Sequence, residues 1–147
     1  GVCAGGAGET GRASGLAVRL LLDTCTFLWL AAEEGRLSNT AVRLFADPAN
    51  DVFLSAVSAW EIAVKHRLGR LRLPQDLDPR DFVPEARQRH AIEALALHEA
   101  DTFGLAKLPP LHADPFDRML VCQAIANQMV LLTPDPLIAQ YPVAVRW

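Results

Sequence analysis

The sequence predicts an α/β fold in which helices cover both faces of a central, mostly parallel five-stranded sheet. Short apolar runs of strand length recur along the chain, and segments with helical spacing separate them. Turn residues mark most of the boundaries. Of the 147 residues, 51% are hydrophobic and 21% are charged, which suits one domain with a hydrophobic core.

The N-terminal part of the chain divides into a tail, a strand and two helices. Residues 1–15 contain six Gly and almost no large apolar side chains, so we expect a flexible tail before a single domain at 16–147. The near-continuous apolar run 16–22 predicts a strand buried on both faces. Helical spacing follows at 27–32 and again at 37–45.

The middle of the chain repeats this alternation. Residues 52–55 predict the second strand, and Ser58 opens a helix that ends at Gly69. A polar helix is expected around 81–88 after a proline-containing stretch, and 91–97 predicts the third strand.

The C-terminal part completes the sheet. A helix at 98–107 precedes a Pro-Pro break, and the longest helical pattern then runs from 115 to 128. Strands four and five are predicted at 129–133 and 143–147.

Acidic residues stand where a parallel sheet places its ligands. Asp23 and Asp135 follow predicted strands, and Glu61 and Asp117 lie in the first turns of the next helices. Because ligands of open α/β sheets gather at the carboxyl ends of the strands, these four acids are expected to point into one crevice.

Such acids adjoin residues that should be buried, where a carboxylate is costly without a positive partner. Mg²⁺ or Mn²⁺ prefers carboxylate oxygens, and the absence of paired His or Cys disfavours zinc. Beside a phosphodiester, such an ion activates water and stabilises the leaving oxygen, so the expected chemistry is phosphodiester hydrolysis.

Each acid also has a purely structural interpretation. Ser58 and Glu61 fit a capping box, and Asp114 fits a helix N-cap with Asp117 favoured by the helix dipole. Asp135 fits a turn or the cap of a short helix at 136–140. A cap interpretation is weakest for Asp23, and one shared site explains the set better than separate coincidences do.

Four motifs contain these acids: Leu21-Leu22-Asp23-Thr24, Ser58-Ala59-Trp60-Glu61-Ile62-Ala63, His112-Ala113-Asp114-Pro115-Phe116-Asp117-Arg118-Met119-Leu120 and Leu132-Thr133-Pro134-Asp135. Together they resemble the motifs of PIN-domain ribonucleases, and their form is similar to the VapC toxins of bacterial toxin–antitoxin pairs. The resemblance covers roughly residues 18–147 and implies a three-layer α/β/α PIN-like domain.

The resemblance also implies roles for the acids. Asp23 and Asp117 would be the principal metal ligands, and Glu61 and Asp135 would complete the catalytic pocket directly or through water. Asp114 would support the site as a helix cap and an outer contact.

Neighbouring residues would assist these acids. Thr24 and Thr133 would orient carboxylates or metal-bound water, although both also suit ordinary strand ends. Arg118 would pair with an acid or reach a phosphate. Cys25 departs from the family pattern, where His or Asn is frequent, and this departure concerns substrate placement rather than the metal ligands.

Contacts to RNA are expected from a basic stretch near Glu61. Lys65, Arg67 and Arg70, with Arg72 beyond them, would meet phosphates, and the alternative is a solvated face. Large apolar side chains at 27–30 and 44–45 would either face a partner or pack in the core.

The implied function is that of a Mg²⁺-dependent endoribonuclease toxin, with RNA as substrate, a VapB-like antitoxin as partner, and a homodimeric state. The alternatives are a PIN-domain nuclease of RNA processing or repair without an antitoxin, an aspartate-dependent phosphatase, and a non-catalytic binding module. The phosphatase needs a second acid two residues after Asp23, where Cys25 stands, and the filled acidic positions disfavour the binding module.

Composition bounds the environment of the protein. The net charge of −3 does not by itself indicate a nucleic-acid partner, so local basic groups or metal must hold a polyanion. Cys3, Cys25 and Cys122 are odd in number and widely spaced, which indicates reduced thiols in the cytoplasm. No uncharged apolar run of membrane-spanning length is present, so no membrane association is expected.

Overall fold

The computed structural model describes residues 17–111 and 113–147, and its centre is one parallel sheet with the strand order β4-β3-β2-β5-β6. The strands are β2 (Arg19–Leu22), β3 (Asp51–Ser55), β4 (Glu93–Leu95), β5 (Val130–Leu132) and β6 (Val145–Arg146). All four pairings between them are parallel. The expected sheet is therefore confirmed, and it is wholly rather than mostly parallel.

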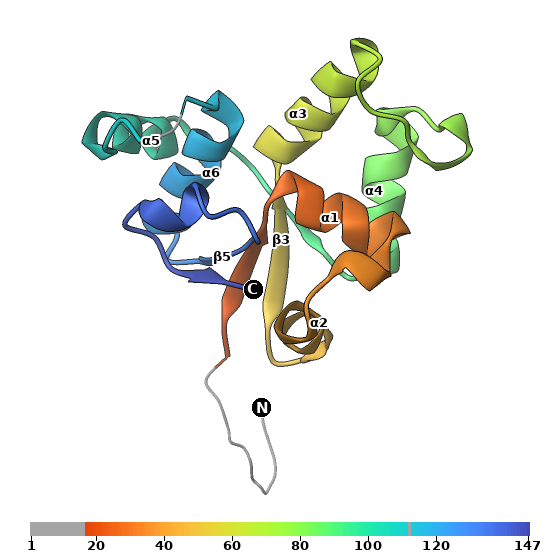
Figure 1. Cartoon of the computed structure of the whole chain (residues 1–147), viewed down its shortest axis with the longest axis horizontal. Helices are drawn as coiled ribbons and strands as arrows, with labels where there is room; N and C mark the ends of the chain where they lie inside the picture. The colour runs from red at the N-terminus through yellow and green to blue at the C-terminus, as the bar shows by residue number, and fades with distance from the viewer. Residues whose placement is uncertain (1–16, 112) are drawn as a thin grey trace, which may run out of the picture.

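Helices connect these strands and form the outer layers. They are α1 (Thr24–Ala32), α2 (Asn39–Ala46), α3 (Ala56–Arg67), α4 (Pro79–Arg89), α5 (Glu99–Thr102) and α6 (Pro115–Ala126). Short 3₁₀ segments lie at η1 (Glu34–Arg36), η2 (Pro74–Asp76), η3 (Phe103–Lys107) and η4 (Ile138–Gln140). In Figure 1, α1, α2 and α4 lie on one side of the strands, and α5 and α6 lie on the other. The three-layer α/β/α prediction is thus confirmed.

Successive side chains of β2 point to opposite faces of the sheet and pack into two separate hydrophobic cores. Leu20 and Leu22 belong to the core under α1, α2 and α4, whereas Leu21 belongs to the core under α6. All three side chains are fully buried, and burying one such leucine contributes about 1.5–3 kcal/mol. A strand covered on both faces has to be apolar throughout, which is why this segment reads as a continuous apolar run.

The strand order reverses direction at the centre of the sheet. From β2 the chain adds β3 and β4 on one side, and it then returns to place β5 against the other side of β2. The carboxyl ends of β2 and β5 therefore flank the topological switch point, where open α/β sheets place their ligands.

Two strands pass into helices with almost no linker. Ser55 ends β3 and caps α3, because its side chain accepts a hydrogen bond from the Val57 N–H at 2.9 Å. The prediction that Ser58 opens this helix is wrong: Ser58 lies inside α3 and is fully buried. The capping-box interpretation of Glu61 falls with it.

Other boundaries shift by a few residues. The two edge strands are shorter than their apolar runs, at Glu93–Leu95 and Val145–Arg146, since only the paired part of each run forms a ladder. Gly69 follows α3 with φ +72°, a left-handed conformation that favours glycine. The predicted tail at 1–15 lies outside the described residues. In the described part of the chain, no helix combines the length and the apolar character that crossing a bilayer demands.

Candidate active site

Asp23 is the most buried acid of the expected site, with 4% of its surface exposed. It follows β2 and caps α1, because its Oδ1 accepts a hydrogen bond from the Thr26 N–H at 2.8 Å. The Thr133 hydroxyl, just after β5, donates to Asp23 Oδ2. This contact joins the two strand ends that flank the switch point.

The Asp23 carboxylate receives its hydrogen bonds from neutral donors. Besides Thr133 and Thr26, the Cys25 thiol lies 3.4 Å from Oδ1 and 3.5 Å from Oδ2. Burial raises the pKa of Asp23 above its ordinary value, and the hydrogen bonds offset only part of that effect. The neighbouring donors therefore stabilise the ionised carboxylate less than water would.

Glu61 lies beside this carboxylate on α3 and is 5% exposed. Its Oε1 accepts a hydrogen bond from the Thr24 hydroxyl at 2.6 Å, and its Oε2 pairs with the Lys65 ammonium at 2.5 Å. The Thr24 oxygen is also 3.0 Å from the Ser58 hydroxyl. Thr24 thus ties the start of α1 to α3, as expected of a residue that orients a carboxylate.

Lys65 places a positive charge beside the acidic residues of the cluster. Its hydrogen bond with Glu61 raises the pKa of Lys65, and the charges of Glu61, Asp114 and Asp117 add to this effect while partial burial opposes it. The Lys65 side chain is 45% exposed. Lys65 was expected to contact RNA, and in the structure its ammonium forms an ion pair with Glu61.

The first turn of α6 brings two further acids to the cluster. Asp114 is its N-cap and accepts hydrogen bonds from the N–H groups of Phe116 at 2.8 Å and Asp117 at 3.1 Å, as predicted. Burial raises the pKa of the Cys25 thiol to about 12, and the charges of Asp23 and Asp117 add to it. Asp117 therefore acts on the same thiol that touches Asp23.

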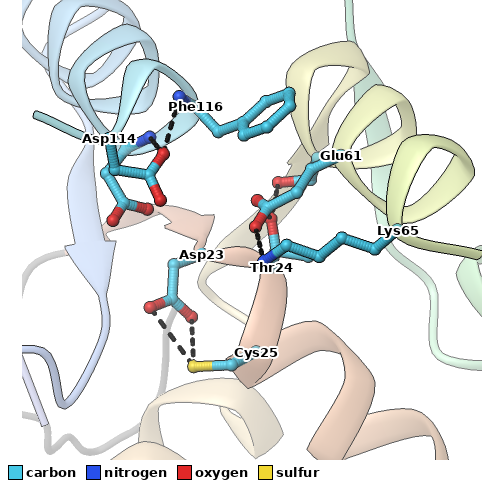
Figure 2. Close-up of polar contacts among 9 residues, drawn as sticks. Asp23, Thr24, Cys25, Glu61, Lys65, Asp114 and Phe116 are labelled. Atoms are coloured by element: carbon cyan, nitrogen blue, oxygen red, sulfur yellow. Dashed lines mark hydrogen bonds and ion pairs between the residues drawn. The ribbon is translucent and has the colours of Figure 1, made fainter. Parts of the chain in front are cut away.

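Figure 2 shows how separate segments supply this cluster. Asp23 lies at the end of β2, Glu61 and Lys65 extend from α3, and Asp114 lies at the start of α6. The Asp23 carboxylate points toward Cys25. The structure thus brings Asp23, Glu61 and Asp114 to this part of the molecule from three separate elements, and the expectation that Asp23, Glu61, Asp117 and Asp135 all point into one crevice stays a prediction.

Asp135 is connected to the cluster through its backbone rather than through its carboxylate. Its N–H donates to the Thr133 hydroxyl at 3.1 Å, and its Oδ1 accepts from the Leu137 N–H at 2.9 Å. The turn interpretation therefore describes the Asp135 side chain, while Thr133 carries the connection on to Asp23.

The donor set fits a hard divalent cation held by few protein ligands. Within residues 17–111 and 113–147, no three His, Cys, Asp or Glu side chains lie close enough to hold one metal ion. Mg²⁺ commonly binds through one or two carboxylates and keeps several waters. The expectation that Asp23 and Asp117 are the principal metal ligands, with Glu61 and Asp135 completing the pocket directly or through water, stays a prediction.

The basic residues predicted to contact RNA do not form one surface. Arg67 lies on another face of α3 from Lys65 and lines a groove between α3, α4 and β4. Arg70 is exposed beyond the end of α3. Arg118 donates to the Pro109 carbonyl at 3.2 Å and to the Tyr141 hydroxyl at 3.1 Å, which ties α6 to the neighbouring loops.

The apolar side chains considered for a partner surface pack largely inside the protein. Phe27 and Leu30 are buried, and Leu28, Leu44 and Phe45 are half-buried against the same core. Trp29 packs on Trp147, with ring centroids 5.9 Å apart. These contacts favour the core interpretation.

Sequence reasoning missed two features of the site. Glu61 and Lys65 stand four residues apart on a helix, a spacing that itself indicates an ion pair. Trp60 was noted only as part of a motif, yet it lies next to Glu61 and is 57% exposed.

Residues 20–143 match the family model of the PIN domain. A stretch of 53 residues is 40% identical to Ribonuclease VapC16 of Mycobacterium tuberculosis (strain ATCC 25618 / H37Rv). That stretch spans 36% of this chain and 36% of the relative.

Solved structures share the fold at low sequence identity. VapBC2 from Rickettsia felis, solved with a DNA fragment from their promoter, has a TM-score of 0.66 at 14% identity, covering 88% of this chain and 98% of that chain. VapBC-1 from nontypeable Haemophilus influenzae has a TM-score of 0.58 at 16% identity, covering 88% and 97%. DNA-bound VapBC from Salmonella typhimurium has a TM-score of 0.62 at 12% identity, with the same coverage. At these identities the similarity shows the fold.

Proposed function

This chain belongs to the PIN-domain family, and on that premise we propose that it is a metal-dependent endoribonuclease whose ion is held by Asp23 and Asp117. One observation carries the proposal: the buried Asp23 carboxylate at the switch point receives its hydrogen bonds from neutral donors, and its pKa is raised. Burying an anion without a positive partner is costly, and a bound cation would remove that cost here.

The surrounding residues have distinct roles in this proposal. Thr133 and Thr26 fix the orientation of the Asp23 carboxylate, and Asp114 holds the first turn of α6 so that Asp117 faces the cluster. The Lys65 ammonium pairs with the Glu61 carboxylate.

A bound Mg²⁺ or Mn²⁺ would supply a nucleophilic water at neutral pH and neutralise charge on the scissile phosphate. The chain itself positions the carboxylates and the attacking water. Glu61, anchored by Thr24 and Lys65, accepts hydrogen bonds from water at this edge of the sheet. Asp135 supports the site through the Thr133 hydroxyl that its N–H contacts.

The test is cleavage of structured RNAs by purified protein with Mg²⁺, with Mn²⁺ and with EDTA. Wild type is compared with Asp23→Asn and Asp117→Asn, which keep the size of each side chain and remove its charge. We expect cleavage only with metal, and a loss of at least about 100-fold in each variant, because each removes a metal ligand. Metal-independent cleavage, or full activity in both variants, contradicts the mechanism.

We further propose that the enzyme is a toxin of the VapC type, acting in the cytoplasm as a homodimer and inhibited by a VapB-like antitoxin. The 40% identity to Ribonuclease VapC16 and the fold shared with VapBC structures support this. Induced expression should stop growth, and co-expression of the adjacent small reading frame should restore it, whereas Asp23→Asn should be harmless alone. Growth arrest by Asp23→Asn as strong as by wild type argues against a toxin that acts by cleavage.

A further inference from the structure

An aromatic pair bridges the two helices that carry acids of the site. The rings of Trp60 on α3 and Phe116 on α6 are edge to face, with centroids 4.8 Å apart and planes at 70°. Trp60 directly precedes Glu61, and Phe116 directly precedes Asp117. In Figure 2 the Phe116 ring extends toward the helix that bears Glu61 and Lys65.

The contact with Phe116 leaves Trp60 largely exposed. Trp60 is 57% exposed, although tryptophan is on average one of the more buried residue types. By contrast, Trp29 and Trp147, which pack on each other, are both half-buried. Phe116 contacts the Trp60 ring, and more than half of the Trp60 surface stays open to solvent.

Charge at this edge of the sheet opposes the binding of a polyanion. Asp23, Glu61, Asp114 and Asp117 gather there, and the nearby Lys65 ammonium is engaged by Glu61. Besides the charge of the proposed metal ion, a ligand with a phosphate backbone gains here from affinity that does not depend on charge. Stacking of a nucleobase on an aromatic ring supplies it, and it suits every base, because each base has a π face.

We propose that Trp60, braced by Phe116, is a stacking platform for an unpaired nucleobase next to the scissile phosphate. The inference rests on the proposed ribonuclease function and assigns to that site a residue that positions the substrate. A base inside a duplex keeps its own stacking partners, so paired RNA gains nothing from the platform. Trp60 is a positioning residue, since it holds the substrate and leaves the reacting atoms to the acids.

The experiment measures binding of a fluorescent unpaired oligoribonucleotide in EDTA, where cleavage is absent, over a series of salt concentrations. Trp60→Ala should weaken binding by about 5- to 150-fold, the range for loss of one base–aromatic stack. The slope of log affinity against log salt should stay unchanged, because no phosphate contact is lost. Trp60→Phe should retain part of the affinity.

Matched controls separate stacking from other effects. Phe103→Ala removes another aromatic ring, 67% exposed on η3, and should leave binding unchanged. The nucleobases of the oligonucleotide are then replaced one at a time by abasic sites. At one position the replacement should weaken binding to wild type as much as Trp60→Ala does, and it should not weaken binding to Trp60→Ala any further. With metal present, Trp60→Ala should raise KM for unpaired RNA more than it lowers kcat.

Several outcomes overturn the inference. They are wild type without affinity for the oligonucleotide in EDTA, Trp60→Ala with wild-type affinity, and equal preference for duplex and unpaired RNA. A dimer that becomes monomeric on Trp60→Ala, with affinity lost only through dissociation, assigns the ring to contact with a second copy. If wild type cleaves RNA and Trp60→Ala binds RNA normally, the stacking platform is rejected and the proposed function stands. If wild type never cleaves RNA, the proposed function is rejected.

Discussion

Asp23 shows at the scale of one residue how a functional group opposes the stability of its own fold. It ends an apolar strand, is almost fully buried, and caps α1. Its raised pKa means that the folded state binds a proton more tightly than the unfolded state does. The ionised carboxylate thus lowers stability at neutral pH, and this penalty disappears as the pH falls below the folded-state pKa.

We therefore expect Asp23→Asn to be inactive and yet more stable than wild type at pH 7 without metal. Asparagine keeps the oxygen that caps α1, its NH₂ group can donate to the Thr133 hydroxyl oxygen where Asp23 Oδ2 accepted from that hydroxyl, and it carries no charge. Each kcal/mol gained raises the Tm of a domain of this size by roughly 2–4 °C. Thermal melts with EDTA and with Mg²⁺ test this: added Mg²⁺ should raise the Tm of wild type and leave that of Asp23→Asn unchanged. A lower Tm for the variant in EDTA would refute the account.

The Glu61–Lys65 pair leads to the opposite prediction. Lys65→Met leaves the buried Glu61 carboxylate with the Thr24 hydroxyl and without its cation, so we expect a loss of about 1–2 kcal/mol of unfolding free energy, limited by the exposure of Lys65. Urea unfolding at pH 7 measures it. In a double-mutant cycle with Glu61→Gln, the second change should cost little once the first is made. Additive losses would show that the pair is not coupled.

The same pair predicts a pH dependence. The folded-state pKa of Lys65 is raised, so its contribution is fully present below the unfolded value of 10.5 and is lost as the pH rises through the folded value. Unfolding free energies of wild type and Lys65→Met should converge in strongly alkaline solution and differ steadily at neutral pH.

Cys25 should be inert despite its partly accessible position. A pKa of about 12, raised by burial and by the adjacent Asp23 carboxylate, leaves almost no thiolate at pH 8. In a Cys3→Ser background, iodoacetamide should label the native protein slowly at pH 8 and the urea-unfolded protein rapidly. Cys122 is buried and its pKa is also raised, so it should not mask the result. Fast labelling of the native protein would contradict the described environment.

At the scale of elements, a buried amide connects α6 to the strands that lead to the site. The Ser55 hydroxyl donates to Gln123 Oε1, and Gln123 Nε2 donates to the Ala96 carbonyl at 3.2 Å. Gln123 is fully buried, so these contacts replace those it would make with water. They fix α6 over the ends of β3 and β4, which keeps the first turn of α6 near the other acids.

Gln123→Ala should lower the unfolding free energy by about 2–4 kcal/mol, because it opens a cavity and leaves the Ala96 carbonyl without this donor. Gln88→Ala, at an exposed position of α4, is the matched control and should change stability by less than about 0.5 kcal/mol. Equal stability of the two variants in urea unfolding would show that the amide contacts contribute nothing.

The elements themselves were predictable to different degrees. The strand over 16–22 and the helix from Pro115 carry strong local signals, an apolar run and an Asp-Pro start, and both are present. The start of α3 was misplaced by the second serine, because Ser55 serves as strand end and helix cap at once. Sequence patterns show that a cap is available, whereas the end of strand pairing decides which residue is used.

The site was predictable where topology alone determines it. β2 and β3 are parallel neighbours followed directly by α1 and α3, so Asp23 and the helix that bears Glu61 come to the same edge whatever the side-chain rotamers are. The direction of each carboxylate is a matter of individual contacts. Sequence reasoning therefore did not show that Glu61 pairs with Lys65, or that Asp135 accepts from Leu137.

At the scale of the whole molecule, the strand order explains why the site lies at its centre. Two cores of different helices meet on the two faces of β2, and the site occupies the carboxyl end of this shared strand. A substitution in either core therefore acts on the acids through the same strand. Activity and stability should fall together for core variants, in contrast to Asp23→Asn.

The hydrogen bond between Thr133 and Asp23 joins residues 110 positions apart, so the site is a late product of biosynthesis. A ribosome releases the first strand long before β5 exists to pair with it, and domains form as their chains emerge. In a nascent chain β2 can pair with β3 early, whereas Asp23 gains its Thr133 hydrogen bond only after β5 has been synthesised and has emerged. For the proposed nuclease, this strand order delays completion of the site until late in translation.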